Sequence, residues 1–101
     1  MKVNLNKKVK IVSKKKIDGY LGMNRPAAKK IKDYKGIVPP KGTEYVSDAV
    51  KKKDRVRIGR HEMIEDDLIT KKGMGYKLAH KISNKLEKQS SSNIRKKLKS
   101  K

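Results

Sequence analysis

The sequence predicts a small α+β domain with two or three short strands, one short helix and a C-terminal helical hairpin. Three observations lead to this fold class. Apolar and polar residues alternate near the N-terminus, a short apolar segment follows two prolines, and a glycine-rich link joins two helix-length stretches at residues 54–70 and 76–89. A chain of 101 residues suffices for one domain, which we expect to span residues 9–89.

The N-terminal segment has two interpretations. An apolar residue recurs on one parity, which is typical of a half-buried strand, at Val3, Leu5, Val9 and Ile11. The same segment carries seven lysines within its first 16 residues, a density that suits a basic arm. Residues 1–8 are therefore expected to form either a basic arm or an edge strand.

A short helix is expected after Asn24 or Arg25, because Pro26 suits a first helical turn. An apolar stripe of about three turns follows before Gly36, formed by Ala27, Ile31 and Tyr34. The two prolines at 39 and 40 exclude both a helix and a central strand. The segment TEYVS, residues 43–47, then predicts a short strand.

A longer helix is expected to begin at Asp48 or Asp54 and to end near Thr70. Its apolar stripe is predicted to consist of Val56, Met63, Ile64 and Leu68. Gly59 would weaken the helix by about 1 kcal/mol relative to alanine, so a start near Arg60 is the alternative.

The glycines of KKGMG, residues 71–75, predict the end of this helix and a tight link to the next one. The second helix should bury a stripe made by Tyr76, Ala79, Ile82 or Ser83, and Leu86. Residues 90–101 combine four serines with five basic residues, which predicts a flexible basic tail.

The net charge of +20 favours a polyanionic partner, and DNA or RNA is the commonest one in cells. Lysine outnumbers arginine by 25 to 5, which favours phosphate contact over base recognition. The predicted contacts are Lys7, Lys8, Lys14, Lys15, Lys16, Lys51, Lys52, Lys53, Arg95, Lys96, Lys97, Lys99 and Lys101. The alternative is a solvated surface in a protein whose genome favours lysine codons.

Other classes of protein fit the sequence poorly. The chain has no cysteine, which excludes disulfides and thiolate zinc fingers and is compatible with an intracellular, cytoplasmic setting. No segment approaches the roughly 20 apolar residues of a membrane helix, so no membrane partner is expected. The glycines form no phosphate-binding loop motif, and the four tyrosines are better explained as core than as base-stacking residues.

The stretch HEMIE, residues 61–65, contains the chain's most specific chemical pattern. His61 and Glu65 are four residues apart and share one helix face, and Glu62 lies between them. The spacing matches the zincin motif H-E-x-x-H, with a glutamate in place of the second histidine. A carboxylate can bind zinc there, and Glu62 would be the general base of a hydrolase.

The other histidine, His80, lies on the second helix, and Glu87 follows two turns later. If the helices pair as a hairpin, His61, Glu65, His80 and Glu87 converge between them. This set of ligands suits Zn, Mn or Fe, and catalysis would require an open coordination position.

The pattern H-E-x-x-E, then G-x-x-Y-x-x-A-H and a glutamate seven residues on, resembles a group of small uncharacterised proteins of phages and prokaryotes. The resemblance covers residues 43–88. It implies a reduced zincin-like helix pair, in which His61, Glu65 and His80 occupy the ligand positions. It implies no particular reaction.

A simpler interpretation needs no metal. The acidic run at residues 65–67 can form surface ion pairs at helical spacing with Lys51, Lys52, Lys53, Arg57 or Lys71. His80 can be a half-buried residue that is hydrogen-bonded to Glu65 across the hairpin. In this interpretation Asp66 and Asp67 are helix-surface charges.

The sequence alone therefore favours a non-enzymatic, nucleic-acid-associated protein of phage type that contacts phosphates without sequence specificity. The first alternative is a zincin-like protein with a structural or hydrolytic zinc site. The second is a phage-type inhibitor that binds an acidic host protein.

Overall fold

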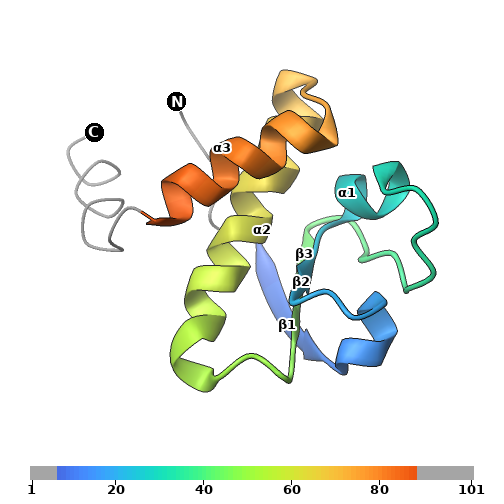
Figure 1. Cartoon of the computed structure of the whole chain (residues 1–101), viewed down its shortest axis with the longest axis vertical. Helices are drawn as coiled ribbons and strands as arrows, with labels where there is room; N and C mark the ends of the chain where they lie inside the picture. Colours follow the sequence, from blue (N-terminus) through green and yellow to red (C-terminus); the bar gives the residue numbers. More distant parts are fainter. Residues whose placement is uncertain (1–6, 89–101) are drawn as a thin grey trace.

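The computed structural model describes residues 7–88, with the backbone alone for Glu87 and Lys88, and it confirms the α+β fold class (Figure 1). The described residues form three strands, one short 3-10 helix and three α-helices. The elements are β1 (Lys8–Val12), η1 (Lys14–Ile17), β2 (Gly22–Met23), α1 (Arg25–Lys30), β3 (Thr43–Ser47), α2 (Lys52–Lys72) and α3 (Tyr76–Lys88). Residues 1–6, for which a basic arm or an edge strand was expected, and the expected tail at 90–101 lie outside the described residues.

The strands form one mixed sheet in the order β1-β3-β2, so the predicted TEYVS strand lies at its centre. β1 runs parallel to β3, and β2 pairs with β3 in the antiparallel sense. β1 is an edge strand, which explains why Val9 and Ile11 remain 42% and 40% exposed where the alternation predicted a buried face. Val12 is the buried residue of this strand.

The short helix α1 begins as predicted, with Pro26 in its first turn, but it ends at Lys30 and is shorter than the three turns expected. Two hydrogen bonds in the segment that follows explain the early end. The Lys35 N–H donates to the Asp18 carboxylate at 3.1 Å, and the Tyr34 hydroxyl donates to the Ile37 carbonyl at 2.6 Å. These contacts hold the chain in a loop where local propensity favoured another helical turn.

Helix α2 begins at Lys52, so the alternative start near Arg60 is wrong. Gly59 lies inside the helix because α2 crosses β1 closely there, and a Cβ at this position would lie 3.1 Å from Val9 Cγ2. Gly73 ends the helix in the left-handed conformation, with φ of 66°, as predicted from KKGMG. Val56 is 63% exposed and does not belong to the apolar stripe.

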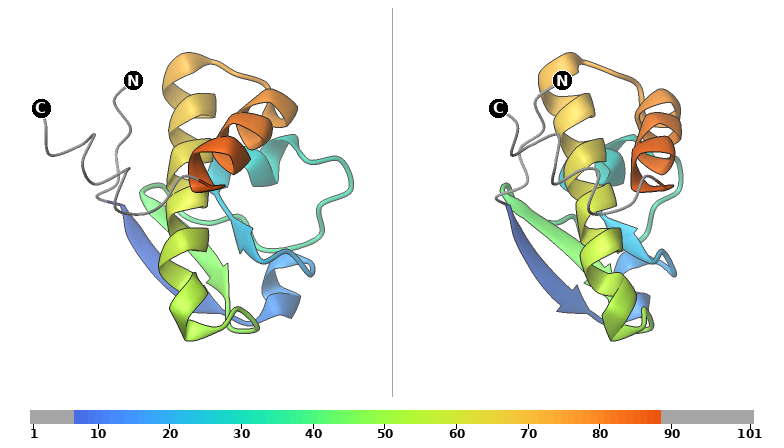
Figure 2. Two further views of the ribbon diagram at one scale, coloured as in Figure 1. Left: turned by 60° about the vertical axis from the view of Figure 1, so that its left-hand side comes forward. Right: turned by 90° about the vertical axis from the view of Figure 1, so that its left-hand side faces the viewer.

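The two C-terminal helices form the predicted hairpin, and α2 lies between the sheet and α3 (Figure 2). Because α2 is covered on both sides, every residue from 61 to 69 is buried. Leu68 of α2 and Ala79 of α3 belong to one apolar core, and Ser83 is fully buried on the same face of α3. None of the helices in residues 7–88 is long and apolar enough to span a membrane.

Candidate metal centre

Buried polar side chains concentrate on α2, where an ordinary core helix would present apolar residues. Glu65 and Asp66 are consecutive, so their side chains diverge by about 100° and enter two different clusters. We call the first the histidine cluster, and it comprises Asn24, His61, Glu62, Glu65 and His80. We call the second the carboxyl cluster, and it comprises Lys7, Glu44, Asp66 and Thr70.

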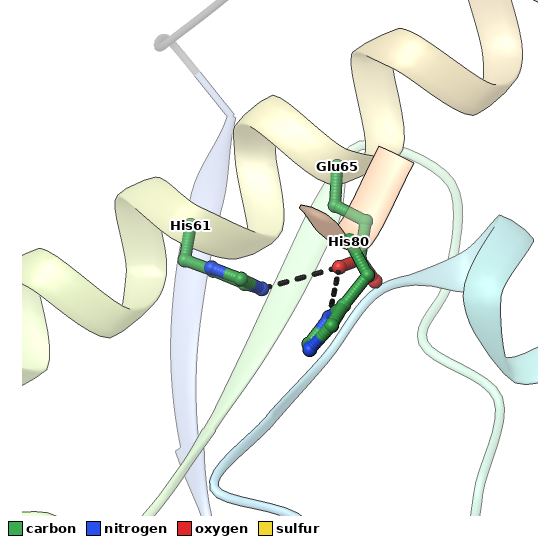
Figure 3. A group of neighbouring side chains, drawn as sticks. All are labelled: His61, Glu65 and His80. Atoms are coloured by element: carbon green, nitrogen blue, oxygen red, sulfur yellow. Dashed lines mark hydrogen bonds and ion pairs between the residues drawn. The ribbon is translucent and has the colours of Figure 1, made fainter. Parts of the chain in front are cut away.

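The histidine cluster brings together the three predicted ligands from both arms of the hairpin (Figure 3). His61 Nε2 lies 3.1 Å from Glu65 Oε2, one turn away on α2. His80 Nδ1, from α3, lies 2.8 Å from the same oxygen. The side chain of Glu87, the fourth predicted ligand, lies outside the described part of the chain.

Asn24 connects this cluster to the short helix α1, and its side chain is fully buried. Its Nδ2 donates to Glu62 Oε1 at 2.9 Å and to Glu65 Oε1 at 3.0 Å. Its Oδ1 accepts from the Ala27 N–H at 2.9 Å, so the same residue also caps α1. The sequence indicated only a position before the short helix, although a capping asparagine keeps an amide group for a second partner.

Glu62, the predicted general base, lies beside the ligands and is buried. Its Oε2 is 3.9 Å from His61 Nε2. β2 approaches this carboxylate so closely that a Cβ on Gly22 would lie 2.7 Å from Glu62 Oε2. Gly22 is therefore required for the position of Glu62, a role that the sequence did not indicate.

The electrostatics of the cluster favour an ionised Glu65. Burial raises the pKa of its carboxyl, but hydrogen bonds from His61, His80 and Asn24 outweigh burial, so the pKa is lowered from its ordinary value. One carboxylate therefore faces two imidazole nitrogens in a largely buried site. This is a donor set of the kind that binds zinc.

The geometry also fits a metal ion. The three ligand atoms lie within 4.8 Å of one another, whereas neighbouring ligands of tetrahedral zinc are about 3.4 Å apart for bonds of about 2.1 Å. Shifts of about 1 Å would bring all three to coordination distance. The His80 side chain is 45% exposed and has the freedom to make such a shift.

A pocket of about 290 Å³ opens beside the cluster, and His61, Glu62, Glu65 and His80 all line it. Tyr76 forms part of its wall, with its ring 5.5 Å from that of His80. Burial raises the pKa of the Tyr76 phenol to about 12, so the phenol is neutral at physiological pH. The cluster is therefore accessible to a small group that enters from solvent.

The carboxyl cluster lies on the sheet side of α2 and corrects the prediction that Asp66 and Asp67 are surface charges, because both are buried. Burial, together with hydrogen bonding to Asp66, raises the pKa of Glu44 from 4.5 to about 11. Burial also raises the pKa of Asp66, but its hydrogen bonds to Glu44, Lys7 and Thr70 outweigh burial and lower the pKa. Glu44 is thus the neutral partner of an ionised Asp66.

The predicted phosphate-contacting residues occupy different positions. Lys7 Nζ lies 2.9 Å from Asp66 Oδ2 inside the carboxyl cluster, so Lys7 is engaged within the protein. The remaining described members are exposed on β1, on η1 and around the start of α2: Lys8, Lys14, Lys15, Lys16, Lys51, Lys52 and Lys53. The predicted contacts from Arg95 to Lys101 lie outside the described residues.

Comparison with known proteins assigns no function, so the function is inferred from this geometry. No family model, no curated protein and no solved structure matches the chain.

Proposed function

We propose that this protein binds one divalent transition-metal ion, with zinc the best match, through His61, Glu65 and His80. The observation that carries the proposal is the convergence of three ligand atoms within 4.8 Å from two helices. Two imidazoles and one carboxylate match the ligand types of catalytic zinc sites. The adjacent pocket supplies the access that a catalytic centre needs.

The same site supports hydrolysis as its chemistry. Zinc in such a site polarises a substrate and lowers the pKa of an activated water to about 7. Glu62 is suited to accept the proton of the attacking water, because it lines the pocket beside His61 and its other oxygen is held by Asn24. Asn24 thereby fixes the base and the ligand Glu65 in one arrangement.

Zinc titration against a chromophoric chelator tests the proposal. Wild-type protein should bind one zinc ion, and His80→Ala should weaken binding about 100-fold or more because a ligand is lost. Glu62→Gln should keep the zinc and lose any hydrolytic activity, and Lys85→Ala on the exposed face of α3 is the control. Equal zinc binding by wild type and His80→Ala would refute the site.

Nucleic-acid association is a second proposal, compatible with the first, and the distribution of charge favours it. Five of the nine acidic residues whose side chains are described are buried, whereas every lysine from Lys8 to Lys85 is exposed. Affinity for an oligonucleotide should fall steeply with salt, because lysines that contact phosphates release counterions. Affinity that stays flat from low to moderate salt would end this proposal, and preference for an acidic protein would favour the inhibitor alternative.

A further inference from the structure

We propose that single-stranded nucleic acid binds across the rim of the metal-centre pocket, held by basic side chains of α2 and α3. The inference rests on the proposed function in one respect, since it makes nucleic acid the ligand presented to that centre. The binding surface itself does not require a bound metal.

The first argument is that the fold separates charges of opposite sign. Among the side chains that the structure describes, the buried acids are Glu44, Glu62, Glu65, Asp66 and Asp67. Side chains withdrawn in this way no longer balance the lysines of the surface, so the exterior is more one-sidedly positive than the composition suggests. A surface of this kind attracts a polyanion at long range.

The second argument is the position of particular basic residues around the pocket. On α2, Arg57 lines the pocket and Lys53 lies one turn before it. On α3, Lys77 and Lys81 each precede a pocket-lining residue, His80 or Asn84, by three positions and are both exposed. Residues three apart are neighbours on a helix surface, so these cations border the pocket on two sides.

Aromatic side chains on the rim of the same pocket favour single-stranded over double-stranded nucleic acid as the ligand. Tyr20 is 37% exposed and Tyr76 is partly buried, and both line the pocket between the basic helices. Aromatic faces beside a basic groove bind unpaired bases by stacking, whereas bases in a duplex are not free to stack on them. Lysines near these rings suit the phosphates between successive bases.

The β1 edge of the sheet provides a matched control surface. Lys8 and Lys10 are exposed there, and β1 is the strand at the opposite edge from β2. β2 contributes Gly22 and Met23 to the pocket, and no residue of β1 lines it. Changing two lysines on either surface removes the same charge from the protein.

The experiment measures binding of a fluorescent single-stranded 20-mer by anisotropy, with DNA and RNA versions, to the full chain. Lys77→Gln with Lys81→Gln should weaken binding about tenfold and reduce the salt slope by about 1.4, which corresponds to two phosphate contacts on a single strand. Lys8→Gln with Lys10→Gln should weaken binding less than about twofold. Unchanged melting temperatures would show that both double variants remain folded.

Equal losses for the two double variants would overturn the inference, because they would indicate diffuse attraction to the whole surface. Equally strong competition by poly-glutamate of matched charge would also overturn it, in favour of an acidic protein partner. A protein that fails to bind zinc but distinguishes the two lysine pairs would refute the metal centre and retain this surface.

Discussion

The histidine cluster and the carboxyl cluster lie on adjacent faces of α2, and buried charge is balanced differently in each. The carboxyl cluster neutralises its acids internally, since Glu44 holds a proton and Lys7 pairs with Asp66. The histidine cluster places an ionised Glu65 against two imidazoles and opens on a pocket. Burial alone therefore does not distinguish the two clusters, whereas metal-ligating groups beside an open pocket do.

The comparison predicts that the carboxyl cluster contributes to stability and not to metal binding. Lys7→Met should lower the free energy of unfolding by about 3 kcal/mol, because it leaves the buried Asp66 carboxylate without its cation. Zinc affinity should remain unchanged. Chemical denaturation and zinc titration measure the two quantities, and Lys8→Met, an exposed neighbour with the same change in charge, is the control.

The histidine cluster depends on close packing as well as on its ligands. Gly22→Ala should lower the free energy of unfolding by about 2 kcal/mol, because the added Cβ would lie 2.7 Å from Glu62 Oε2 and force that side chain to move. Any hydrolytic rate should fall more than zinc affinity, since Glu62 is not one of the three ligands. Gly75→Ala, where a Cβ meets nothing within 4 Å, is the matched control. A variant as stable as the control would contradict the account of Gly22.

Glu44 should make the stability of the protein decrease with rising pH. Its pKa is raised from 4.5 to about 11, so at neutral pH the folded protein holds a proton that the unfolded chain has released. Stability is therefore lost progressively as pH rises above about 5, by about 1.4 kcal/mol for each pH unit. Glu44→Gln mimics the neutral carboxyl and should remove this slope. Denaturation between pH 5 and pH 8 measures the difference, and parallel pH profiles would show that Glu44 is ionised.

Local signals explain what the sequence could predict. Gly73 ends α2 by a conformation that glycine adopts readily, so the hairpin was predictable, and helical spacing then places His61 and Glu65 on one face. The convergence of His80 with them follows from the hairpin itself. The fold class depended on the same features together with the TEYVS strand.

Long-range contacts explain what the sequence could not predict. Asn24 joins the cluster through partners that lie 38 and 41 residues away, and no local pattern encodes such a contact. Asp66 and Asp67 were expected on the surface because charge normally indicates exposure, yet α2 is covered by the sheet and by α3. The early end of α1 likewise involves a contact between distant residues, the hydrogen bond from the Lys35 N–H to the Asp18 carboxylate.

The metal content of protein purified without a polyhistidine tag tests the central claim most directly. Elemental analysis should find one zinc or similar ion for each wild-type chain and none in His61→Ala. The His61→Ala protein should also lose the thermal stabilisation that added zinc gives the wild type, because a ligand bound by the folded state alone raises its stability. A wild-type protein that is free of metal, and whose melting temperature zinc leaves unchanged, would contradict the metal centre.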